Sequence, residues 1–375
     1  MKHLSLLIKP ASSLCNMRCR YCFYADVGAH RSMPSYGFMQ AETARRVIDN
    51  TLKDLDKGDE ITFAFQGGEP SLAGLKWFED FTAHVSRARG EDISVHYAFQ
   101  TNGLVLDREW AAFFKKHDFL VGLSLDGTKG LHDRNRLDAE GRGSWERVMG
   151  VKGLLDETQV EYNILCVLTN ELAGESEKVW GFILREGIRY IQFIPCLEGL
   201  PDDDAPPGGA GNQGLRPPRF AQFYSRLFSL WLKELEGGHY VSVKLFDDTA
   251  NYFFKGIVSS CGINGRCSPQ FVVEADGGVY PCDFYVLDSY KTGNLSSQGP
   301  EEIFNSPLTR NFLEEGKTGE ASSRFCGECR YREPCRGGCK RMRRAMYYRE
   351  GNFCGYRAFL DKCLTRLGEA LERFF

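Results

Sequence analysis

Six apolar segments between residues 4 and 194 alternate with amphipathic segments, and this repetition constrains the fold more than any other feature. The apolar segments are rich in β-branched and aromatic residues, as strands are, and the segments between them have the period of a helix. Strand–helix repeats favour parallel strands joined by right-handed crossovers. Six units are too few for a closed eight-stranded barrel, so the sequence predicts an α/β fold with an open, partial (β/α)6 barrel of the TIM type.

The expected elements fall into two regions. The expected strands span residues 4–9, 61–66, 95–100, 119–124, 160–168 and 189–194, and the expected helices span residues 41–55, 75–88, 108–117, 144–157, 174–187 and 219–238. The Pro- and Gly-rich stretch 199–218 is expected to be a long surface loop. From about residue 240 the chain turns to short strands, turns and cysteines. We expect a barrel domain over residues 1–238 and a cysteine-rich domain with terminal helices over residues 239–375.

Charge and hydropathy restrict the classes of partner that the chain is expected to bind. The formal net charge is −3, which does not favour nucleic acid. No apolar run approaches the roughly 20 residues that span a bilayer. The apolar run at the N-terminus is too short for the core of a signal peptide. We therefore expect a cytoplasmic protein with neither a nucleic-acid nor a membrane partner.

Fourteen cysteines are present, and they cluster at the two ends of the sequence. In a reducing compartment such cysteines are not expected to form disulfides, and clustering points to metal. Cys166 and Cys196 lie in apolar runs and Cys363 lies on an expected terminal helix, so we interpret these three as packing residues.

The first cluster of cysteines reads CNMRCRYC and contains Cys15, Cys19 and Cys22. Structural zinc normally takes four protein ligands, and no histidine stands at short spacing to supply a fourth. A four-iron cluster held by three cysteines leaves one iron open to an exogenous ligand. From the residues alone zinc and a chance grouping stay open, although the open cluster is favoured.

The spacing C-x3-C-x2-C, with Tyr21 before the last cysteine and directly after a first strand, resembles the signature of the radical S-adenosylmethionine (radical SAM) enzymes. The resemblance implies that the amino and carboxylate groups of SAM bind the open iron. It also assigns residues at later strand ends: the GGEP element in FQGGEP, Ser124 near the ribose, and Arg136 at the SAM carboxylate, which its planar fork matches. The expected cofactor contacts are Tyr21, Gln66, Gly67, Gly68, Glu69, Gln100, Ser124 and Arg136, and Tyr24 is assigned to the substrate.

The cysteine-rich tail resembles the SPASM extension of peptide-modifying radical SAM enzymes. It carries the seven-cysteine pattern of that extension, and Cys261 adds an eighth. Spacing alone does not sort the eight thiolates into sets, and zinc ribbons remain the alternative for the C-x2-C pairs. The resemblance implies two more [4Fe-4S] clusters, one on Cys261, Cys267, Cys282 and Cys339, the other on Cys326, Cys329, Cys335 and Cys354. Clusters saturated in this way are expected to carry electrons.

Over nearly its whole length the chain resembles the anaerobic sulfatase-maturating enzymes, in segments such as FAFQGGEPSLAGL and QFVVEADGGVYPCDFYVLD. The resemblance implies oxidation of a Cys or Ser side chain, within C/S-x-P/A-x-R of a sulfatase polypeptide, to Cα-formylglycine. A 5′-deoxyadenosyl radical would take the Cβ hydrogen. Asp283, directly after Cys282, would act as the base. A flavodoxin or ferredoxin is the expected electron donor, and the cofactors are SAM and three [4Fe-4S] clusters.

Two other functions remain open from the sequence. One is another SPASM peptide maturase that forms thioether or carbon–carbon crosslinks. Many of these have a peptide-recognition domain before the core, and Cys15 comes too early for one. The other is a non-catalytic iron–sulfur electron carrier, which leaves the GGEP element, Arg136 and the open iron without a purpose.

Overall fold

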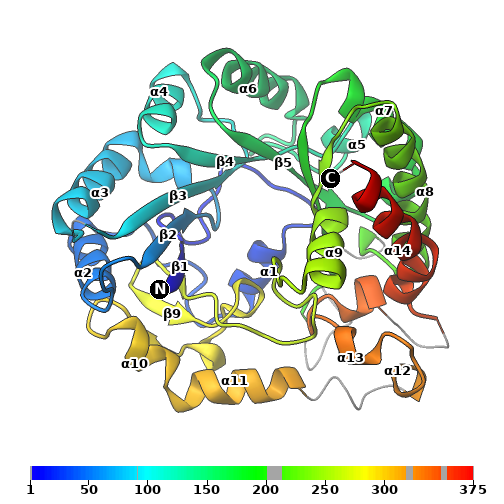
Figure 1. The fold of residues 1–375 in the computed structure, drawn as a ribbon. Helices are drawn as coiled ribbons and strands as arrows, with labels where there is room; N and C mark the ends of the chain where they lie inside the picture. Colours follow the sequence, from blue (N-terminus) through cyan, green and yellow to red (C-terminus); the bar gives the residue numbers. More distant parts are fainter. Residues whose placement is uncertain (1, 91, 201–212, 318–323, 348–352, 375) are drawn as a thin grey trace. The chain divides into compact units, whose positions relative to one another are not determined.

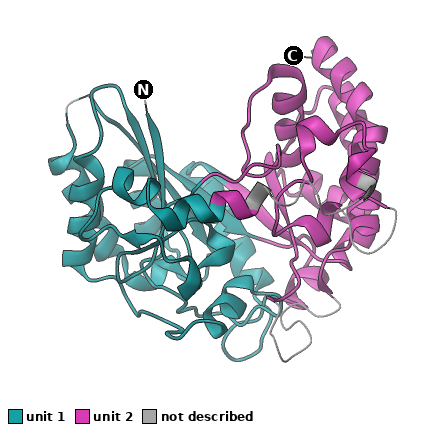
Figure 2. Cartoon of the chain, turned by 90° about the horizontal axis from the view of Figure 1, so that it is seen from below, with its two compact units in different colours: residues 1–124, 136–162, 269–312 teal, residues 125–135, 163–268, 313–375 magenta. Residues whose placement is uncertain are grey.

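The computed structural model describes residues 2–90, 92–200, 213–317, 324–347 and 353–374. The chain divides into two compact units that interleave along the sequence (Figure 2). Unit 1 comprises residues 1–124, 136–162 and 269–312, and unit 2 comprises residues 125–135, 163–268 and 313–375. The predicted domain boundary after residue 238 stays a prediction, since these units exchange segments rather than meeting at one position.

Unit 1 is built on parallel strands with most of its helices along one side (Figure 1). The strands are β1 (His3–Ile8), β2 (Glu60–Phe65), β3 (Ser94–Thr101) and β4 (Phe119–Ser124), which pair in sequence order. The helices are α1 (Phe23–Ala29), α2 (Ala41–Leu52), α3 (Leu75–Ala88), α4 (Arg108–Lys116), α6 (Trp145–Thr158) and the short 3-10 turn η1 (Pro70–Ala73). Local signals explain their bounds. Asp107, for example, caps α4 by accepting from the amides of Glu109 and Trp110.

The core of unit 1 is aromatic. Phe65, Phe78, Phe99 and Phe114 are each at most 1% exposed, and their rings meet at centroid distances of 5.0–6.4 Å. Edge-to-face and tilted contacts of this kind add to the free energy gained by burying the rings. This rigid layer holds the ends of β1 to β4 in place, and the loops that follow those ends carry most of the predicted site residues.

A late segment extends the same sheet beyond β1, which the sequence analysis did not anticipate. β8 (Val272–Val273) pairs in parallel with β1, β9 (Gly278–Tyr280) pairs antiparallel with β8, and β10 (Gly293–Asn294) pairs antiparallel with β9. The 3-10 turns η4 (Asp283–Tyr285) and η5 (Asp288–Tyr290) and the helices α10 (Pro300–Phe304) and α11 (Pro307–Lys317) follow. Because β9 leads directly into Cys282 and Asp283, this extension brings both residues beside the first strand.

Unit 2 contains the remaining parallel strands and the cysteine-rich tail. Its strands are β5 (Tyr162–Leu168), β6 (Tyr190–Pro195) and β7 (Ser242–Val243). Its helical elements are α5 (Lys129–Asp133), η2 (Leu172–Gly174), α7 (Ser176–Arg185), α8 (Pro217–Glu236), α9 (Lys244–Lys255), α12 (Arg324–Gly327), α13 (Arg332–Cys335), the π-helix η7 (Arg343–Tyr347) and α14 (Gly355–Phe374). Helices α8, α9 and α14 share an aromatic core in which the Phe246 and Phe359 rings stack.

The predicted elements are confirmed within a few residues at their ends. The six expected strands correspond to β1–β6, and the helix expected over 75–88 is α3. Residues 201–212 of the expected loop lie outside the described residues. Within the described part of the chain, no helix is both long enough and apolar enough to cross a bilayer.

Candidate active site

The three N-terminal cysteines lie on the loop between β1 and α1 in unit 1. Cys22 begins α1, since its Sγ accepts from the amide of Ala25 at 3.4 Å. Cys15 is half-buried, and its Sγ accepts from the amide of Met17 at 3.4 Å. Burial raises the pKa of Cys15 to about 11. Burial therefore disfavours a free thiolate at this position. Iron replaces the thiol proton and neutralises the thiolate charge, so the chemistry of these donors fits a metal cluster.

A neighbouring turn of unit 1 fastens the middle of this loop. Met17 forms an antiparallel bridge with Asp138, and the Arg18 amide donates to the Leu137 carbonyl at 2.7 Å. Asp138 accepts from the amide and guanidinium of Arg142 and from Arg147. These donors, led by the Arg142 amide, lower the pKa of Asp138 to about 2. The ionised carboxylate thus stabilises the turn that fastens the loop.

The two glycines after β2 lie directly against the cysteine loop. The Gly68 amide donates to the Ser12 carbonyl at 2.7 Å, and the Glu69 amide donates to the Leu14 carbonyl at 2.8 Å. A Cβ on Gly68 would stand 2.1 Å from the Leu14 carbonyl oxygen, so no larger residue fits there. An ammonium group only donates hydrogen bonds, so the predicted contact of this element with the SAM amino group would use its backbone carbonyls.

Glu69 joins the loops after β2 and β3. It is 1% exposed and accepts hydrogen bonds from the Ser71 amide and hydroxyl, the Thr101 hydroxyl and the Asn102 amide. Burial raises its pKa, and these hydrogen bonds oppose that shift. Both carboxylate oxygens accept hydrogen bonds from the protein, so Glu69 has a structural role in holding the two loops together. Its direct contact with SAM stays a prediction.

Asn102 is a site residue that the sequence analysis missed. Its Nδ2 donates to Asn16 Oδ1 at 2.8 Å and lies 3.7 Å from Cys15 Sγ. Hydrogen bonds to thiolate ligands are one means by which a protein sets the potential of an iron–sulfur cluster. Asn102 directly follows β3, within the FQTNG segment, and this position at a strand end could have identified it as a site residue.

Four other predicted cofactor residues belong to the same unit. Gln100 donates to the Ser124 hydroxyl at 3.1 Å, so the structure brings these two together at the ends of β3 and β4. Arg136 is 7% exposed, and its guanidinium lies 5.6 Å from the centre of the Tyr21 ring. Tyr21 itself is 8% exposed.

Asp283 is held by side chains from two strand ends. Its Oδ1 pairs with Lys9 Nζ at 2.5 Å, and its Oδ2 accepts from Gln66 Nε2 at 2.5 Å. Lys9 directly follows β1 and is fully buried, and Gln66 directly follows β2. The Asp283 amide donates to Gln270. Lys9 was also missed from the sequence, because a lysine after a strand usually reaches solvent.

Tyr24 belongs to the same buried network. The Lys9 ammonium lies 3.9 Å from the centre of its ring, a cation–π contact. Its hydroxyl donates to Glu274, which also pairs with Arg31 at 2.6 Å. Burial and the Glu274 carboxylate raise the pKa of Tyr24 well above its ordinary value. The hydroxyl is therefore engaged inside the protein, and the predicted substrate contact of Tyr24 stays a prediction.

The cysteine loop and the Asp283 turn pack against each other. Phe23, which follows Cys22, and Phe284, which follows Asp283, meet with ring centroids 5.1 Å apart. Residues about 260 positions apart in sequence are thus adjacent within unit 1. The structure places a carboxylate beside a potential cluster loop, an arrangement suited to proton removal next to redox chemistry.

The fold of unit 2 brings four of its cysteines together, a grouping that their spacing in the sequence did not specify. One pocket is lined by Cys326, Cys329, Cys335 and Cys354. The described residues hold no group of three or more His, Cys, Asp or Glu close enough to bind a single metal ion. Four thiolates that line one pocket fit a multi-iron cluster, in which each thiolate binds its own iron. Burial raises the pKa of Cys335 to about 12, because a free thiolate is unfavourable there. Ligation to metal stabilises the thiolate and offsets this effect.

The second set is partly assembled in unit 2. A Cβ on Gly262, the residue after Cys261, would lie 2.7 Å from the Cys339 Cβ. After burial, the charges of Cys339 and Cys261 are the largest causes that raise the pKa of Cys267, which reaches about 11. Cys261, Cys267 and Cys339 therefore lie together. Cys282, which the resemblance adds to them, belongs to unit 1.

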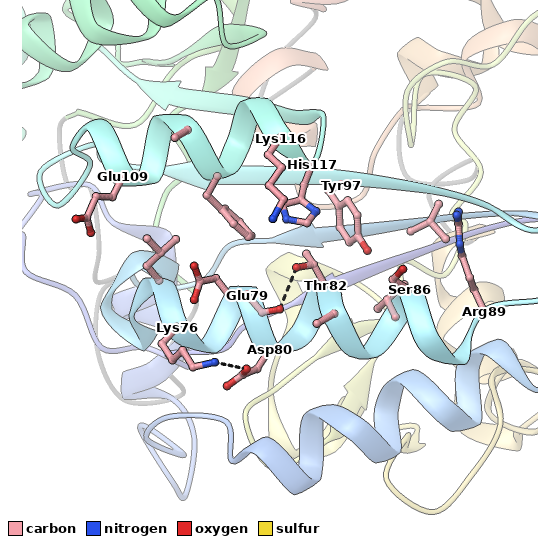
Figure 3. Close-up of a pocket in the computed structure, with 16 residues that line it drawn as sticks. Lys76, Glu79, Asp80, Thr82, Ser86, Arg89, Tyr97, Glu109, Lys116 and His117 are labelled. Atoms are coloured by element: carbon pink, nitrogen blue, oxygen red, sulfur yellow. Dashed lines mark hydrogen bonds and ion pairs between the residues drawn. The ribbon is translucent and has the colours of Figure 1, made fainter.

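A wide hollow of unit 1 lies elsewhere. It measures about 850 Å³ and lies between α3 and α4, with Tyr97 of β3 at its floor (Figure 3). Its lining contains no cysteine and none of the predicted site residues. Volume alone therefore does not identify the active site of this protein.

Comparisons with known proteins agree with this geometry. A family model described as the Radical SAM superfamily matches residues 10–172, and one described as the SPASM iron-sulfur cluster-binding domain matches residues 261–330. The predicted fold class is thereby confirmed, and the two domains indicate SAM and iron–sulfur clusters as cofactors.

Relatives of known function match over nearly the full length. A cysteine-type anaerobic sulfatase-maturating enzyme of Clostridium novyi (strain NT) is 39% identical over 98% of this chain and 97% of its own. A serine-type enzyme of Klebsiella aerogenes is 29% identical over 95% of this chain and 84% of its own. A solved structure, native anSMEcpe with bound AdoMet and Cp18Cys peptide, matches with a TM-score of 0.89 and 36% identity over 100% of both chains. The chain therefore belongs to the anaerobic sulfatase-maturating enzymes, radical SAM oxidoreductases that oxidise a Cys or Ser residue to formylglycine.

Proposed function

We propose that this chain oxidises the Cys of a C-x-P/A-x-R segment in a sulfatase polypeptide to Cα-formylglycine. The observation that carries the proposal is the contact between the cysteine loop and the Asp283 turn through Phe23 and Phe284. Preference for Cys over Ser is supported by the higher identity to the cysteine-type relative, 39% against 29%. The solved relative binds a peptide, which supports a peptide substrate.

Cys15, Cys19 and Cys22 would hold a [4Fe-4S] cluster with one iron open to SAM. With SAM bound there, reduction supplies a 5′-deoxyadenosyl radical that removes a hydrogen from the target Cβ. The protein positions the cofactor. Backbone carbonyls of Gly67 and Gly68 would accept from its ammonium group, and Arg136 would pair with its carboxylate. Tyr21, Gln66, Glu69, Gln100 and Ser124 complete the proposed SAM site.

Asp283 would accept the thiol proton of the target cysteine. Lys9 and Gln66 fix its two oxygens from different directions, so the carboxylate cannot rotate away from the reacting sulfur. Lys9 also balances the charge of this nearly buried carboxylate. Lys9 is therefore a positioning residue, and Tyr24 supports it through the cation–π contact. Loss of the proton and an electron from the carbon-centred radical would give a thioaldehyde, which water would convert to the aldehyde with release of hydrogen sulfide.

The electron released in that step needs an acceptor. We assign two further [4Fe-4S] clusters, three in all, to the C-terminal cysteines. The four cysteines that share a pocket, Cys326, Cys329, Cys335 and Cys354, support one set. The grouping of Cys261, Cys267 and Cys339 supports the other, with Cys282 as its fourth ligand. Both would be saturated by thiolates and would exchange electrons rather than bind substrate.

The cellular setting belongs to the same proposal. A flavodoxin or ferredoxin would deliver the reducing electron, and the protein would work in the cytoplasm, where iron–sulfur clusters and free thiols persist. The non-catalytic carrier is disfavoured by the Lys9–Asp283–Gln66 arrangement beside the cysteine loop, because electron transfer alone needs no held carboxylate.

An anaerobic assay tests the proposal. The reconstituted protein receives SAM, dithionite and a peptide of about 18 residues with Cys-x-Pro-x-Arg, a length that suits docking as an extended segment. We expect an aldehyde that a hydrazine traps, and about 12 irons per chain from three four-iron clusters. The matched control is the same peptide with Ser in place of Cys, which we expect to react more slowly. SAM cleavage without any trapped aldehyde, or a crosslinked peptide product, would refute the proposal.

A further inference from the structure

Asp248 is a buried carboxylate of α9 that the proposed mechanism does not use. It is 4% exposed. Its Oδ1 accepts from the Ser259 hydroxyl at 2.6 Å and pairs with Lys244 Nζ, and its Oδ2 accepts from the Ser260 hydroxyl. Lys244 Nζ also donates to the Ser260 hydroxyl at 3.0 Å. These four residues, Lys244, Asp248, Ser259 and Ser260, form the Asp248 network, which joins α9 to the loop that follows it.

The loop side of this network directly precedes a predicted cluster ligand. Ser260 is followed by Cys261. Residues 256–259 are exposed, so packing against the rest of unit 2 does little to order them. A cysteine that ends an unrestrained segment loses conformational entropy when it binds iron, which weakens its ligation. The hydrogen bonds to Asp248 restrain this segment within the fold itself and so reduce that loss.

The same face of α9 also holds the other set of cysteines. Tyr252 lies one helical turn after Asp248, and its hydroxyl donates to the Pro334 carbonyl at 2.8 Å. Pro334 directly precedes Cys335. Two side chains of one helix thus bind the residues just before a cysteine of each C-terminal set. Helix α9 is therefore a common support for both sets within unit 2.

The two cysteine loops of unit 2 also approach each other closely at glycines. A Cβ on Gly265 would lie 2.4 Å from the Cys335 carbonyl oxygen, in addition to the close approach of Gly262 to Cys339. Such backbone contact leaves the loop after Cys261 few positions relative to the turn that carries Cys339. The position of the Cys261 thiol then depends on how the chain enters this loop, and Asp248 fixes that entry at Ser260.

We propose that Asp248 is a positioning residue that holds Cys261 in place as a ligand, together with Cys267 and Cys339. The inference rests on the proposed function, which assigns a four-iron cluster to this set. Without the Asp248 network Cys261 would detach, three thiolates would remain, and one iron of that cluster would be open. An open iron binds exogenous molecules. Asp248 therefore restricts such binding to the N-terminal cluster, where SAM is required.

Mild oxidation followed by electron paramagnetic resonance tests the inference. The background is full-length Cys15→Ala/Cys19→Ala/Cys22→Ala, reconstituted with iron and sulfide, so that any open iron belongs to the C-terminal cysteines. When ferricyanide oxidises a four-iron cluster with three thiolates, one Fe²⁺ leaves and one electron passes to ferricyanide. The product is a three-iron cluster with a resonance of its own.

We expect the background protein to hold about 8 irons per chain and to give little of this resonance after oxidation. Asp248→Ala should raise the resonance about tenfold or more and release about one iron per chain, because one of its clusters has an open iron. The Lys244 side chain is 39% exposed, so the change leaves no buried, unpaired charge. Cys261→Ala, which removes the ligand itself, should give the same resonance.

The matched control is Asp247→Ala, which removes the neighbouring carboxylate of α9. Asp247 accepts from the Tyr240 hydroxyl at 2.7 Å and from the Ser242 hydroxyl, both of which precede the helix. We expect the resonance of this variant to stay at the background level. Ser259→Ala/Ser260→Ala removes the loop side of the network and keeps the ion pair with Lys244. This variant decides the question if Asp248→Ala does not fold, and it should give the resonance as well.

Two results would overturn the inference. One is the absence of the resonance from Asp248→Ala and from Ser259→Ala/Ser260→Ala at about 8 irons per chain, which would show that Cys261 binds iron without the network. The other is an equal resonance in Asp247→Ala, which would indicate a general loss of structure. About 4 irons in the background protein would refute the assignment of two C-terminal clusters, and the inference with it. Because the experiment uses neither SAM nor peptide, a failure of the proposed oxidation would appear only in the aldehyde assay.

Discussion

The two cysteine-bearing regions of this molecule are stabilised in opposite ways. In unit 1, the loop with Cys15, Cys19 and Cys22 is fastened by backbone hydrogen bonds to neighbouring loops, such as Gly68 to Ser12 and Arg18 to Leu137. In unit 2, the cysteines from 326 to 339 lie on α12, α13 and turns, and each of these helices has four residues. Helices this short are not stable by themselves. The first region is therefore preorganised by the protein, and the second depends on the clusters it binds.

The largest expected effect is that of removing iron. Stripping the clusters with a chelator should abolish hydrogen-exchange protection in residues 324–347, since metal binding there supplies folding free energy. Protection in β1 to β3 should persist, because the aromatic core of unit 1 is independent of metal. Mass spectrometry of exchanged peptides measures both regions in one sample. Equal loss of protection in the two regions would contradict the view that only the second region depends on metal. Reconstitution with iron and sulfide, which should restore protection, is the control.

Asp283→Asn tests the held carboxylate. We expect the rate of aldehyde formation to fall about 10²-fold or more, as for loss of a general base. SAM cleavage should change less than twofold, since the cysteine loop does not depend on this side chain. Chromatography measures the amounts of 5′-deoxyadenosine and of trapped aldehyde, and their ratio separates SAM cleavage from substrate oxidation. If both fall together, Asp283 does not have the role of base.

Lys9→Met should act through Asp283. The buried ion pair loses one member, which costs about 3 kcal/mol or more in similar cases and frees the carboxylate to rotate. We expect aldehyde formation to fall about tenfold at saturating peptide, with KM nearly unchanged, and Lys9→Arg to recover part of the rate. The matched control is Lys57→Met, which removes the exposed pair between Lys57 and Asp92 at 2.6 Å. An equal effect of both changes would exclude a special role for Lys9.

Asp138→Asn should give the smallest effect and a pH signature. The pKa of Asp138 in the fold is about 2, below its ordinary value of 3.8. Its contribution to stability is therefore complete above the ordinary value and is lost as the pH falls from there toward 2. We expect a Tm lower by about 2 °C at pH 6, and a difference from the unaltered protein that shrinks as the pH falls. A difference that is constant with pH would contradict this account.

Much of the fold and part of the site could be predicted from local signals. The strands and helices have periodic apolar patterns, and the cysteine spacings are short-range features, so each can be interpreted within a few dozen residues. Lys9 could not be predicted in this way. Its partner Asp283 is more than 270 residues away, and only the pairing of β8 with β1 brings them together. The contact of the Tyr24 hydroxyl with Glu274 depends on the same sheet extension, and the predicted substrate contact of Tyr24 stays a prediction.

The sequence by itself determined the barrel units, the three-cysteine loop and the family, because these depend on residue types at short spacing. The tertiary structure alone decided which distant side chains meet. It sorted Cys326, Cys329, Cys335 and Cys354 into one pocket and seated the Asp283 carboxylate between Lys9 and Gln66. Spacing along a chain does not specify distance in space, and buried charges find their partners only when the strands that carry them pair.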